Sequence, residues 1–127
     1  MNERPKRILV LDDEEAIRLS LEMFLGDFSW QVHTAADTAT ALKLIEHNCI
    51  DLALVDVRLA GESGNRFIVE ALKIQPKLKV LIHTGSIDYA VPPELQKLGI
   101  GEAQVVRKPQ PDLMRFLALL EAQLAGS

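Results

Sequence analysis

The sequence is poor in cysteine, in aromatic residues and in long apolar runs. Cys49 is its only cysteine, so the chain forms no internal disulfide and offers no thiolate cluster for a metal. With one Trp and one Tyr, it has too few rings for a platform on which nucleic-acid bases stack. No apolar run approaches the ~20 residues that span a bilayer, and the start, MNERPKR, lacks the apolar centre of a signal peptide. We therefore expect a cytoplasmic protein that does not insert into a membrane.

The charge balance is mildly acidic, and the composition is that of a globular domain. The 127 residues carry a net charge of −4, while 48% are hydrophobic and 25% are charged. This length fits one domain, so we predict a single domain over residues 1–127 with its core at about 7–124. Direct binding to nucleic acid is disfavoured, because neutralising phosphates requires a basic patch.

Short apolar runs alternate with amphipathic helical segments along the chain. We predict five strands, at residues 8–11, 30–35, 51–57, 79–84 and 103–108. The run at 51–57 is almost continuously apolar, which is typical of a strand buried on both faces. This alternation predicts an α/β fold, with a parallel sheet between two layers of helices.

Five helical segments lie between and after these strands. The first has an apolar stripe and a glycine at its end: Ile17, Leu21, Phe24, Leu25, Phe28 and Gly26. Asp37 is suited to cap the second helix, and the last should begin at about Asp112. The fourth should be short or irregular and end at Gly99, because Pro92 and Pro93 favour extended backbone before them.

Acidic residues stand where two of the predicted strands end. Asp12 and Asp13 follow the first strand, and Asp56 follows the apolar residues of the third. Right-handed crossovers place the carboxyl ends of parallel strands at one edge, so these carboxylates should face one crevice, a hard-oxygen site suited to Mg²⁺. For the DDEE run alone an alternative stays open, since acids are favoured in a helix's first turn, and Glu14 and Glu15 fit that explanation.

Two further strand ends bring a hydroxyl and an ammonium group to the same edge. Thr84 ends the fourth strand before Gly85 and Ser86, and Lys108 ends the fifth before Pro109. The cation would neutralise the acids, while the hydroxyl and the ammonium could receive an incoming anion.

The order Asp-Asp, Asp, Thr and Lys-Pro at these strand ends resembles the receiver domain of two-component response regulators, over about residues 7–124. The resemblance implies a flavodoxin-like three-layer sandwich with strand order 2-1-3-4-5 and five helices. It also implies a signalling domain rather than an enzyme with a separate substrate. Its partners would be a histidine kinase or histidine phosphotransfer protein and an unidentified downstream protein. We expect a monomer or weak homodimer, with Met114 and Leu119 as candidates for a dimer face.

The resemblance assigns a role to each residue of the phosphorylation site. Asp56 would be the phosphoacceptor that attacks a phosphohistidine and becomes an aspartyl phosphate. Asp13, Asp56 and the backbone carbonyl of Arg58 would bind Mg²⁺, and Asp12 would act through a bound water. Lys108 would pair with phosphoryl oxygens, because phosphoryl transfer depends on positioning and on neutralising charge.

Other roles concern the groups around the transferred phosphoryl. Thr84 would donate its hydroxyl to that group, and Gly85 would leave room for its approach. Arg58 and Ser86 would set the rate of water attack, although Arg58 could equally be a solvated loop residue. The Lys108–Pro109 bond would be cis.

Several positions depart from the family's usual pattern, and one agrees with it. Val105 replaces an aromatic residue, Ala60 a proline and Gln110 a hydrophobic residue, whereas Gly64 fits at the start of the third helix. In the family, the aromatic residue normally couples phosphorylation to the face formed by the fourth strand and the fourth helix. Without it, the sequence leaves open how phosphorylation would change the surface that a downstream protein binds. The loop 85–91 is our candidate for the switching element.

Two other functions remain possible. A receiver-shaped scaffold that is never phosphorylated is favoured by Val105 and the irregular fourth helix, while the complete set of acids, Thr84 and Lys108 argues against it. An aspartyl-phosphate phosphatase would need a second acid two residues after the nucleophile, where Arg58 stands. Whether the chain acts alone or as the N-terminal domain of a longer regulator is not decided by the sequence.

Two residues outside this set have structural explanations. We expect His83 to be packed on the strand face opposite to Thr84, because successive side chains of a strand alternate. Cys49 should be a small, buried or half-buried residue.

Overall fold

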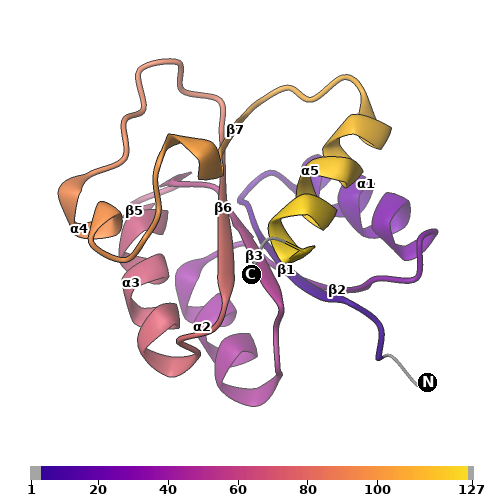
Figure 1. Cartoon of the computed structure of the whole chain (residues 1–127), viewed down its shortest axis with the longest axis horizontal. Helices are drawn as coiled ribbons and strands as arrows, with labels where there is room; N and C mark the ends of the chain where they lie inside the picture. Colours follow the sequence, from indigo (N-terminus) through magenta and orange to yellow (C-terminus); the bar gives the residue numbers. More distant parts are fainter. Residues whose placement is uncertain (1–3, 126–127) are drawn as a thin grey trace.

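A five-stranded parallel sheet in the order β2-β1-β3-β6-β7 forms the centre of the molecule (Figure 1). The computed structural model describes residues 4–125, so the ends of the predicted domain 1–127, residues 1–3 and 126–127, lie outside it. The strands of this sheet are β1 (Arg7–Leu11), β2 (Gln31–Ala35), β3 (Leu52–Val55), β6 (Lys79–Thr84) and β7 (Val105–Arg107). Counted among themselves they have the order 2-1-3-4-5, and the predicted flavodoxin-like α/β fold is confirmed.

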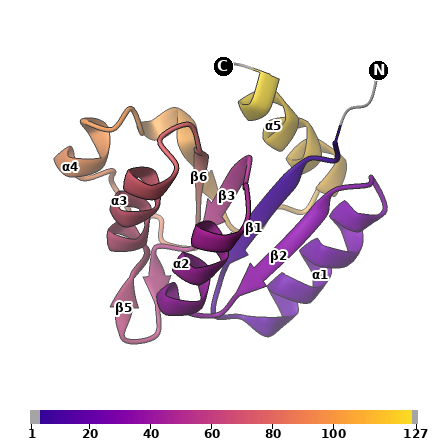
Figure 2. The same ribbon diagram turned by 90° about the horizontal axis from the view of Figure 1, so that it is seen from below.

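Helices cover both faces of the sheet and make three layers (Figures 1 and 2). One face carries α1 (Glu15–Gly26) and α5 (Leu113–Ala125), and the other carries α2 (Thr38–His47) and α3 (Gly64–Ile74). The short α4 (Pro93–Gln96) packs on the α3 side through the fully buried Leu95, and a 3₁₀ turn, η1 (Glu102–Gln104), precedes β7. None of the helices in the described part is long and apolar enough to cross a membrane.

The alternation of side chains in β1 supplies both hydrophobic cores. Ile8 and Val10 pack with the residues of α1 and α5, whereas Leu9 and Leu11 pack with those of α2 and α3. All four are buried, because successive side chains of a strand point to opposite faces and both faces are covered. The same holds for β3, every residue of which is buried, as the sequence predicted.

Some of the helix ends agree with the predictions, and others differ. The Asp37 carboxylate accepts the backbone N–H of Thr40 and caps α2, as predicted. The helix α1 ends at Gly26, as predicted, but Phe28 lies beyond this end and is 43% exposed, so the prediction that Phe28 continues the apolar stripe was wrong. The helix α4 ends at Gln96 and not at Gly99, because residues 97–99 form a turn in which the N–H groups of Leu98 and Gly99 donate to the carbonyls three residues before them.

Two features of the connections were not predicted. Cys49 is exposed, so the expectation that it is buried was wrong; it lies in the short connection between α2 and β3 and has no core position to fill. After β3 the chain forms a hairpin of β4 (Arg58–Leu59) and β5 (Glu62–Ser63), whose strands are too short to produce a periodic pattern. This hairpin stands directly after Asp56.

Candidate functional site

Three carboxylates meet where β1 and β3 end. These strands are neighbours, with Leu11 opposite Val55, and the N–H of Asp56 donates to the carbonyl of Leu11 at 2.8 Å. Asp12, Asp13 and Asp56 each offer an oxygen within 4.8 Å of the others' oxygens. The structure therefore brings together the three acids that the sequence singled out. Such a set of hard oxygen atoms fits Mg²⁺.

Lys108 projects into this cluster from the end of β7. Its N–H donates to the carbonyl of Thr84 at 2.8 Å, which fixes the two strand ends side by side. Its Nζ lies 2.8 Å from Asp12 Oδ2, 3.3 Å from Asp56 Oδ2 and 3.5 Å from Glu14 Oε1. The Lys108–Pro109 bond is cis, as predicted. One ammonium group thus offsets several clustered carboxylates.

Burial and charge act on the pKa values of this cluster in opposite directions. Burial raises the pKa of Asp56, and the charge of Asp12 adds to the rise, although the N–H of Arg58 and the charge of Lys108 lower it in part. Burial lowers the pKa of Lys108, but hydrogen bonding and charge from Asp12 and Asp56 outweigh that effect, and the pKa is raised overall. The lysine therefore stays charged at neutral pH.

A cavity of about 480 Å³ opens above these groups and is lined by Asp13, Glu14, Asp56, Arg58, Gly85, Ser86, Ile87, Asp88 and Lys108. Two predicted site residues lie behind it. Asp12 is 1% exposed, and Thr84 is fully buried, with its Oγ1 accepting the N–H of Ser86 at 3.1 Å. Asp56 therefore borders the cavity although it is only 5% exposed, whereas Asp12 and Thr84 do not border it.

Backbone N–H groups hold the carboxylates of Asp12 and Asp56 in place, and an arginine side chain holds the backbone of Asp12. Asp12 Oδ1 accepts the N–H of Glu14 at 2.9 Å, and Asp56 Oδ1 accepts that of Arg58 at 3.0 Å. The Arg18 guanidinium donates to the Asp12 carbonyl at 2.8 Å. Sequence reasoning missed Arg18 altogether and treated Glu14 only as an acid at a helix start. No local pattern marks either contact, since both depend on where α1 begins relative to β1.

Gly64 lets α3 begin against the backbone of Asp56. A Cβ at this position would overlap the carbonyl oxygen of Asp56 and would lie 2.9 Å from Val57 Cα and from a side-chain carbon of Val55. Real Cβ atoms do not approach backbone so closely, so only glycine fits without a shift of the chain. The predicted start of the third helix at Gly64 is confirmed.

His83 packs on the opposite side of β6 from the site, as predicted. It is 6% exposed and stacks on Phe116 of α5, with ring centroids 5.4 Å apart. Neither ring nitrogen has a hydrogen-bond partner among the described residues. Burial, and next the charge of Lys108, lower the pKa of His83 to about 4, so the ring is neutral at neutral pH.

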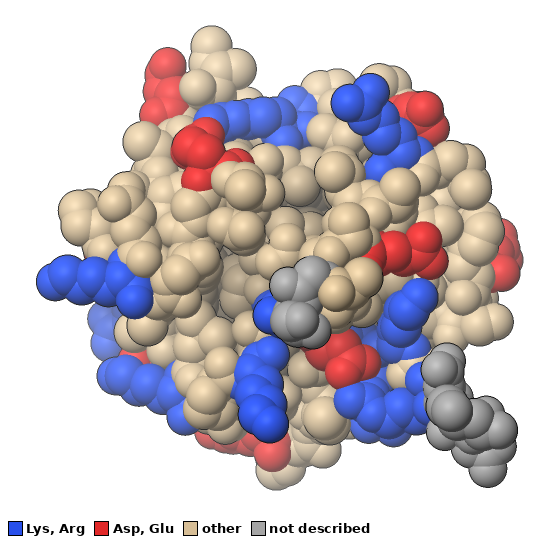
Figure 3. Space-filling view, in the orientation of Figure 1, with Lys and Arg blue, Asp and Glu red and all other residues tan. Residues whose placement is uncertain are grey.

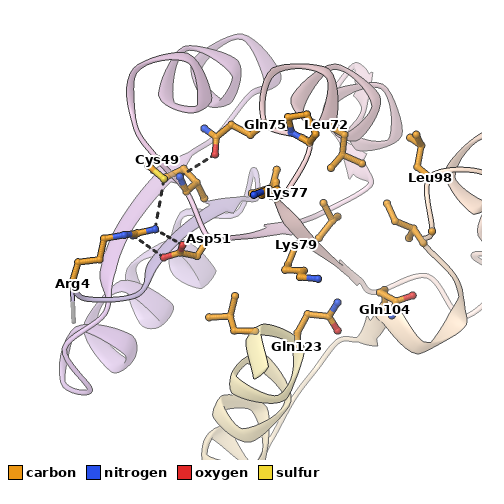
Figure 4. Close-up of a pocket in the computed structure, with 17 residues that line it drawn as sticks. Arg4, Cys49, Asp51, Leu72, Gln75, Lys77, Lys79, Leu98, Gln104 and Gln123 are labelled. Atoms are coloured by element: carbon orange, nitrogen blue, oxygen red, sulfur yellow. Dashed lines mark hydrogen bonds and ion pairs between the residues drawn. The ribbon is translucent and has the colours of Figure 1, made fainter. Parts of the chain in front are cut away.

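A larger hollow, of about 910 Å³, lies at the opposite end of the sheet, where β3 and β6 begin (Figure 4). Arg4 pairs there with Asp51 at 2.7 Å and reaches the sulfur of Cys49, and the side chains of Lys77 and Lys79 line its wall. None of the predicted site residues borders it. The candidate site is therefore not the larger hollow, and it is distinguished by the clustered acids and Lys108.

Basic side chains are dispersed on the face that Figure 3 shows. Lys and Arg are scattered over this face, with Asp and Glu between them, and they form no continuous basic surface there. This agrees with the mildly acidic net charge of −4.

The sequence matches the family of response regulator receiver domains over residues 8–119. It is 35% identical over 114 residues to the alginate biosynthesis transcriptional regulatory protein AlgB of Pseudomonas putida, covering 87% of this chain and 24% of that protein. The chain spans about a quarter of the length of two AlgB proteins that it matches, 24% of the one from Pseudomonas putida and 27% of the one from Pseudomonas aeruginosa.

Solved structures show the same fold. A CheY-like response regulator receiver domain protein from Methanospirillum hungatei superimposes with a TM-score of 0.81 at 27% identity, covering 96% of this chain and 95% of that one. The response regulator protein TrrA of Thermotoga maritima, in complex with Mg²⁺ and BeF, has a TM-score of 0.78 at 26% identity, covering 94% and 99%.

Proposed function

The chain belongs to the family of response regulator receiver domains, the signalling domains of two-component systems, and from this we propose that Asp56 is its phosphoacceptor. Receiver domains of this family partner with histidine kinases, so the donor would be a phosphohistidine of a kinase or of a phosphotransfer protein. One observation carries the proposal: Asp56 lines the cavity with an oxygen 3.3 Å from Lys108 Nζ and in a cluster with Asp12 and Asp13.

The reaction is a transfer between two nucleophiles. An oxygen of the ionised Asp56 attacks phosphorus, the P–N bond breaks, and the imidazole of the donor leaves with the electron pair and takes up a proton. The phosphoryl oxygens bring negative charge into a site that already holds three carboxylates. Lys108 Nζ lies within reach of Asp56 and would turn toward those oxygens, which favours the transfer by neutralising charge. The domain would act on itself and on its donor only.

The residues present fit Mg²⁺, because three carboxylates offer oxygens within 4.8 Å of one another. Asp13, Asp56 and the carbonyl of Arg58 would hold the ion, and Asp12 would act through a water. A bound Mg²⁺ would supply positive charge against the phosphoryl oxygens.

Thr84 and Ser86 would link phosphorylation to the loop 85–91. Thr84 Oγ1 accepts the N–H of Ser86, which leaves the hydroxyl proton of Thr84 free to be donated to the phosphoryl group. Since Thr84 is fully buried, we infer that the donation requires the loop to shift. Gly85 would leave room for the phosphoryl group, and Arg58 and Ser86 on the cavity wall would limit the access of water to it.

The output of this domain is a separate proposal. Val105 is half-buried at the start of β7 and packs on the core that contains Leu95 of α4. This position therefore has no aromatic ring that could move when the domain is phosphorylated. We propose that an unidentified downstream protein binds the loop 85–91. We also propose that the domain is cytoplasmic and that it is a monomer or a weak homodimer. The same observation favours a second candidate, a scaffold that is never phosphorylated.

Phosphorylation by a small donor separates these candidates. The protein is incubated with acetyl phosphate and Mg²⁺, and its intact mass is measured. We expect a gain of one phosphoryl group, which Asp56→Asn abolishes and Asp88→Asn, a change on the same cavity wall, leaves in place. A folded protein that gains no mass would instead be the scaffold. Sustained release of phosphate from many small phosphate esters would indicate a phosphatase.

A further inference from the structure

Arg107 of β7 holds the loop 85–91 by two of its backbone carbonyls. Its Nη1 donates to the carbonyl of Ser86 at 2.6 Å, and its Nη2 donates to the carbonyl of Tyr89 at 3.1 Å. Nη2 also lies 3.4 Å from Oε1 of Glu102. A guanidinium group can bind several acceptors at once, because its N–H donors point outward in one rigid plane. One side chain therefore fastens two points of the loop to the last strand of the sheet.

The two carbonyls stand at the ends of a turn, 86–89, that forms part of the cavity wall. The N–H of Tyr89 donates to the carbonyl of Ser86 at 3.4 Å, so this carbonyl accepts both from the turn and from Arg107. Ser86 and the two residues after it line the cavity, as the proposed phosphoacceptor does. The position of this wall is therefore set in part by Arg107.

The backbone of Arg107 belongs to a part of the sheet against which the loop can move. It pairs with Thr84 in the parallel ladder of β6 and β7, and the next N–H, that of Lys108, donates to the Thr84 carbonyl at 2.8 Å. The Thr84 hydroxyl is fully buried and accepts the N–H of Ser86 at 3.1 Å. A loop shift that lets this hydroxyl reach a phosphoryl group would move the Ser86 carbonyl, while the Arg107 backbone stays in the sheet.

The other end of the turn is fixed to α3. The Tyr89 hydroxyl donates to Asn65 Oδ1 at 3.0 Å, and Tyr89 packs on the core of the face that carries α2 and α3. Because the guanidinium is bound at Tyr89 and Glu102, it cannot follow the Ser86 carbonyl without losing those acceptors as well. Arg107 therefore opposes a shift of the loop and does not accompany it.

We propose that Arg107 is a positioning residue that holds the loop 85–91 in the conformation of the unphosphorylated domain, and that phosphorylation of Asp56 breaks its contact with Ser86. The inference rests on the proposed function, which makes Asp56 the phosphoacceptor and requires the loop to shift. Coupling between two such events is reciprocal. Since phosphorylation costs the contact of Arg107, removing that contact favours the phosphorylated conformation.

The test measures how readily the unphosphorylated protein binds a mimic of the phosphoryl group. Beryllium fluoride is titrated into the whole chain with Mg²⁺ present, and the concentration that half-saturates the protein is read from its amide resonances. We expect Arg107→Met to need roughly tenfold less beryllium fluoride, about what the loss of one hydrogen bond from a charged group amounts to. Arg115→Met, at an exposed position of α5, is the matched control and should bind like the unchanged protein.

The direction of the change separates this role from a merely structural one. If Arg107 only stabilised the loop, its loss would disorder the cavity wall and weaken the binding of beryllium fluoride. Equal or weaker binding by Arg107→Met therefore overturns the inference.

A second measurement uses the unchanged protein and does not depend on the folding of a variant. The proton that Arg107 Nη1 donates to Ser86 takes part in a short, charge-assisted hydrogen bond, so its resonance should lie downfield of the other guanidinium protons. It should move upfield when Mg²⁺ and beryllium fluoride bind. A resonance that stays in place while beryllium fluoride binds overturns the inference alone. A protein that neither binds beryllium fluoride nor gains a phosphoryl group from acetyl phosphate contradicts the proposed phosphoacceptor, and the inference with it.

Discussion

Lys108 Nζ lies closer to Asp12 Oδ2, at 2.8 Å, than to Asp56 Oδ2, at 3.3 Å. The ion pair with Asp12 is buried, since the two side chains are 12% and 2% exposed. The lysine is therefore held by the acid behind the proposed phosphoacceptor as well as by the phosphoacceptor itself. In the metal-free protein it offsets the charge of these acids, and under the proposed function it would turn toward the phosphoryl group.

Lys108→Met should destabilise the metal-free protein strongly. Removing one partner of a buried pair leaves uncompensated charge, which costs about 3 to 5 kcal/mol of the free energy of unfolding. Mg²⁺ should then raise the melting temperature of the variant more than that of the unchanged protein, because the ion replaces the lost positive charge. Thermal unfolding with and without Mg²⁺ measures both effects. Lys97→Met, at an exposed position, is the control, and equal melting temperatures for the two variants would contradict the argument.

Gly64→Ala should destabilise the fold and disturb the site. The added Cβ overlaps the Asp56 carbonyl, so the start of α3 or the residues after β3 must move, at about 1 to 3 kcal/mol. Phosphorylation by acetyl phosphate should slow in parallel. Gly26→Ala is the matched control, since nothing lies within 4 Å of its Cβ. Chemical denaturation measures the free energy of unfolding of both variants. If Gly26→Ala lowers it as much as Gly64→Ala does, the overlap with the backbone is not the cause.

His83→Phe should remove part of the acid sensitivity of the fold. The folded pKa of His83 is about 4, below its ordinary value of 6.5, so only the unfolded chain takes up the proton between these values. Stability is therefore full above pH 6.5 and falls as the pH drops toward 4, by at most about 3 kcal/mol at 1.36 kcal/mol per pKa unit. Urea unfolding at several pH values should show a shallower slope for His83→Phe. Parallel slopes in the two proteins would mean that this histidine does not titrate as described.

Tyr89→Phe should loosen the loop 85–91. The Tyr89 hydroxyl donates to Asn65 Oδ1 at 3.0 Å, and Arg107 binds the carbonyls of Ser86 and Tyr89 at 2.6 and 3.1 Å. Loss of the hydroxyl removes a contact of about 1 kcal/mol, so amides of the loop should exchange with solvent about fivefold faster. Hydrogen exchange followed by mass spectrometry measures this.

A double variant provides the control for the Tyr89 prediction. Asn65→Ala removes the same hydrogen bond from the other side, so its effect on exchange should match that of Tyr89→Phe. The two changes combined should add nothing further, because only one contact is lost. Additive effects would show that the two residues act separately.

The regular elements could be predicted from the sequence because their residues repeat with a fixed period. The apolar run Leu52–Val55 is buried on both faces, and the cap at Asp37 is the one expected. The helix α4 was foreseen as short from Pro92 and Pro93, but its end was placed three residues too late. The exposure of Cys49 was missed, because side-chain type says little about burial in a connection between elements.

The sequence by itself determined which residues stand at the strand ends: Asp12, Asp13, Asp56, Thr84 and Lys108. A parallel sheet with crossover helices brings strand ends to one edge, so their order in the chain was enough to predict a common site. Tertiary structure alone decided how they share it. Three features could not be predicted: the short ion pair between Lys108 and Asp12, the complete burial of Thr84, and the hydrogen bond from the Ala60 N–H to Asp13. They depend on distances between segments far apart in the chain, which no local periodicity encodes.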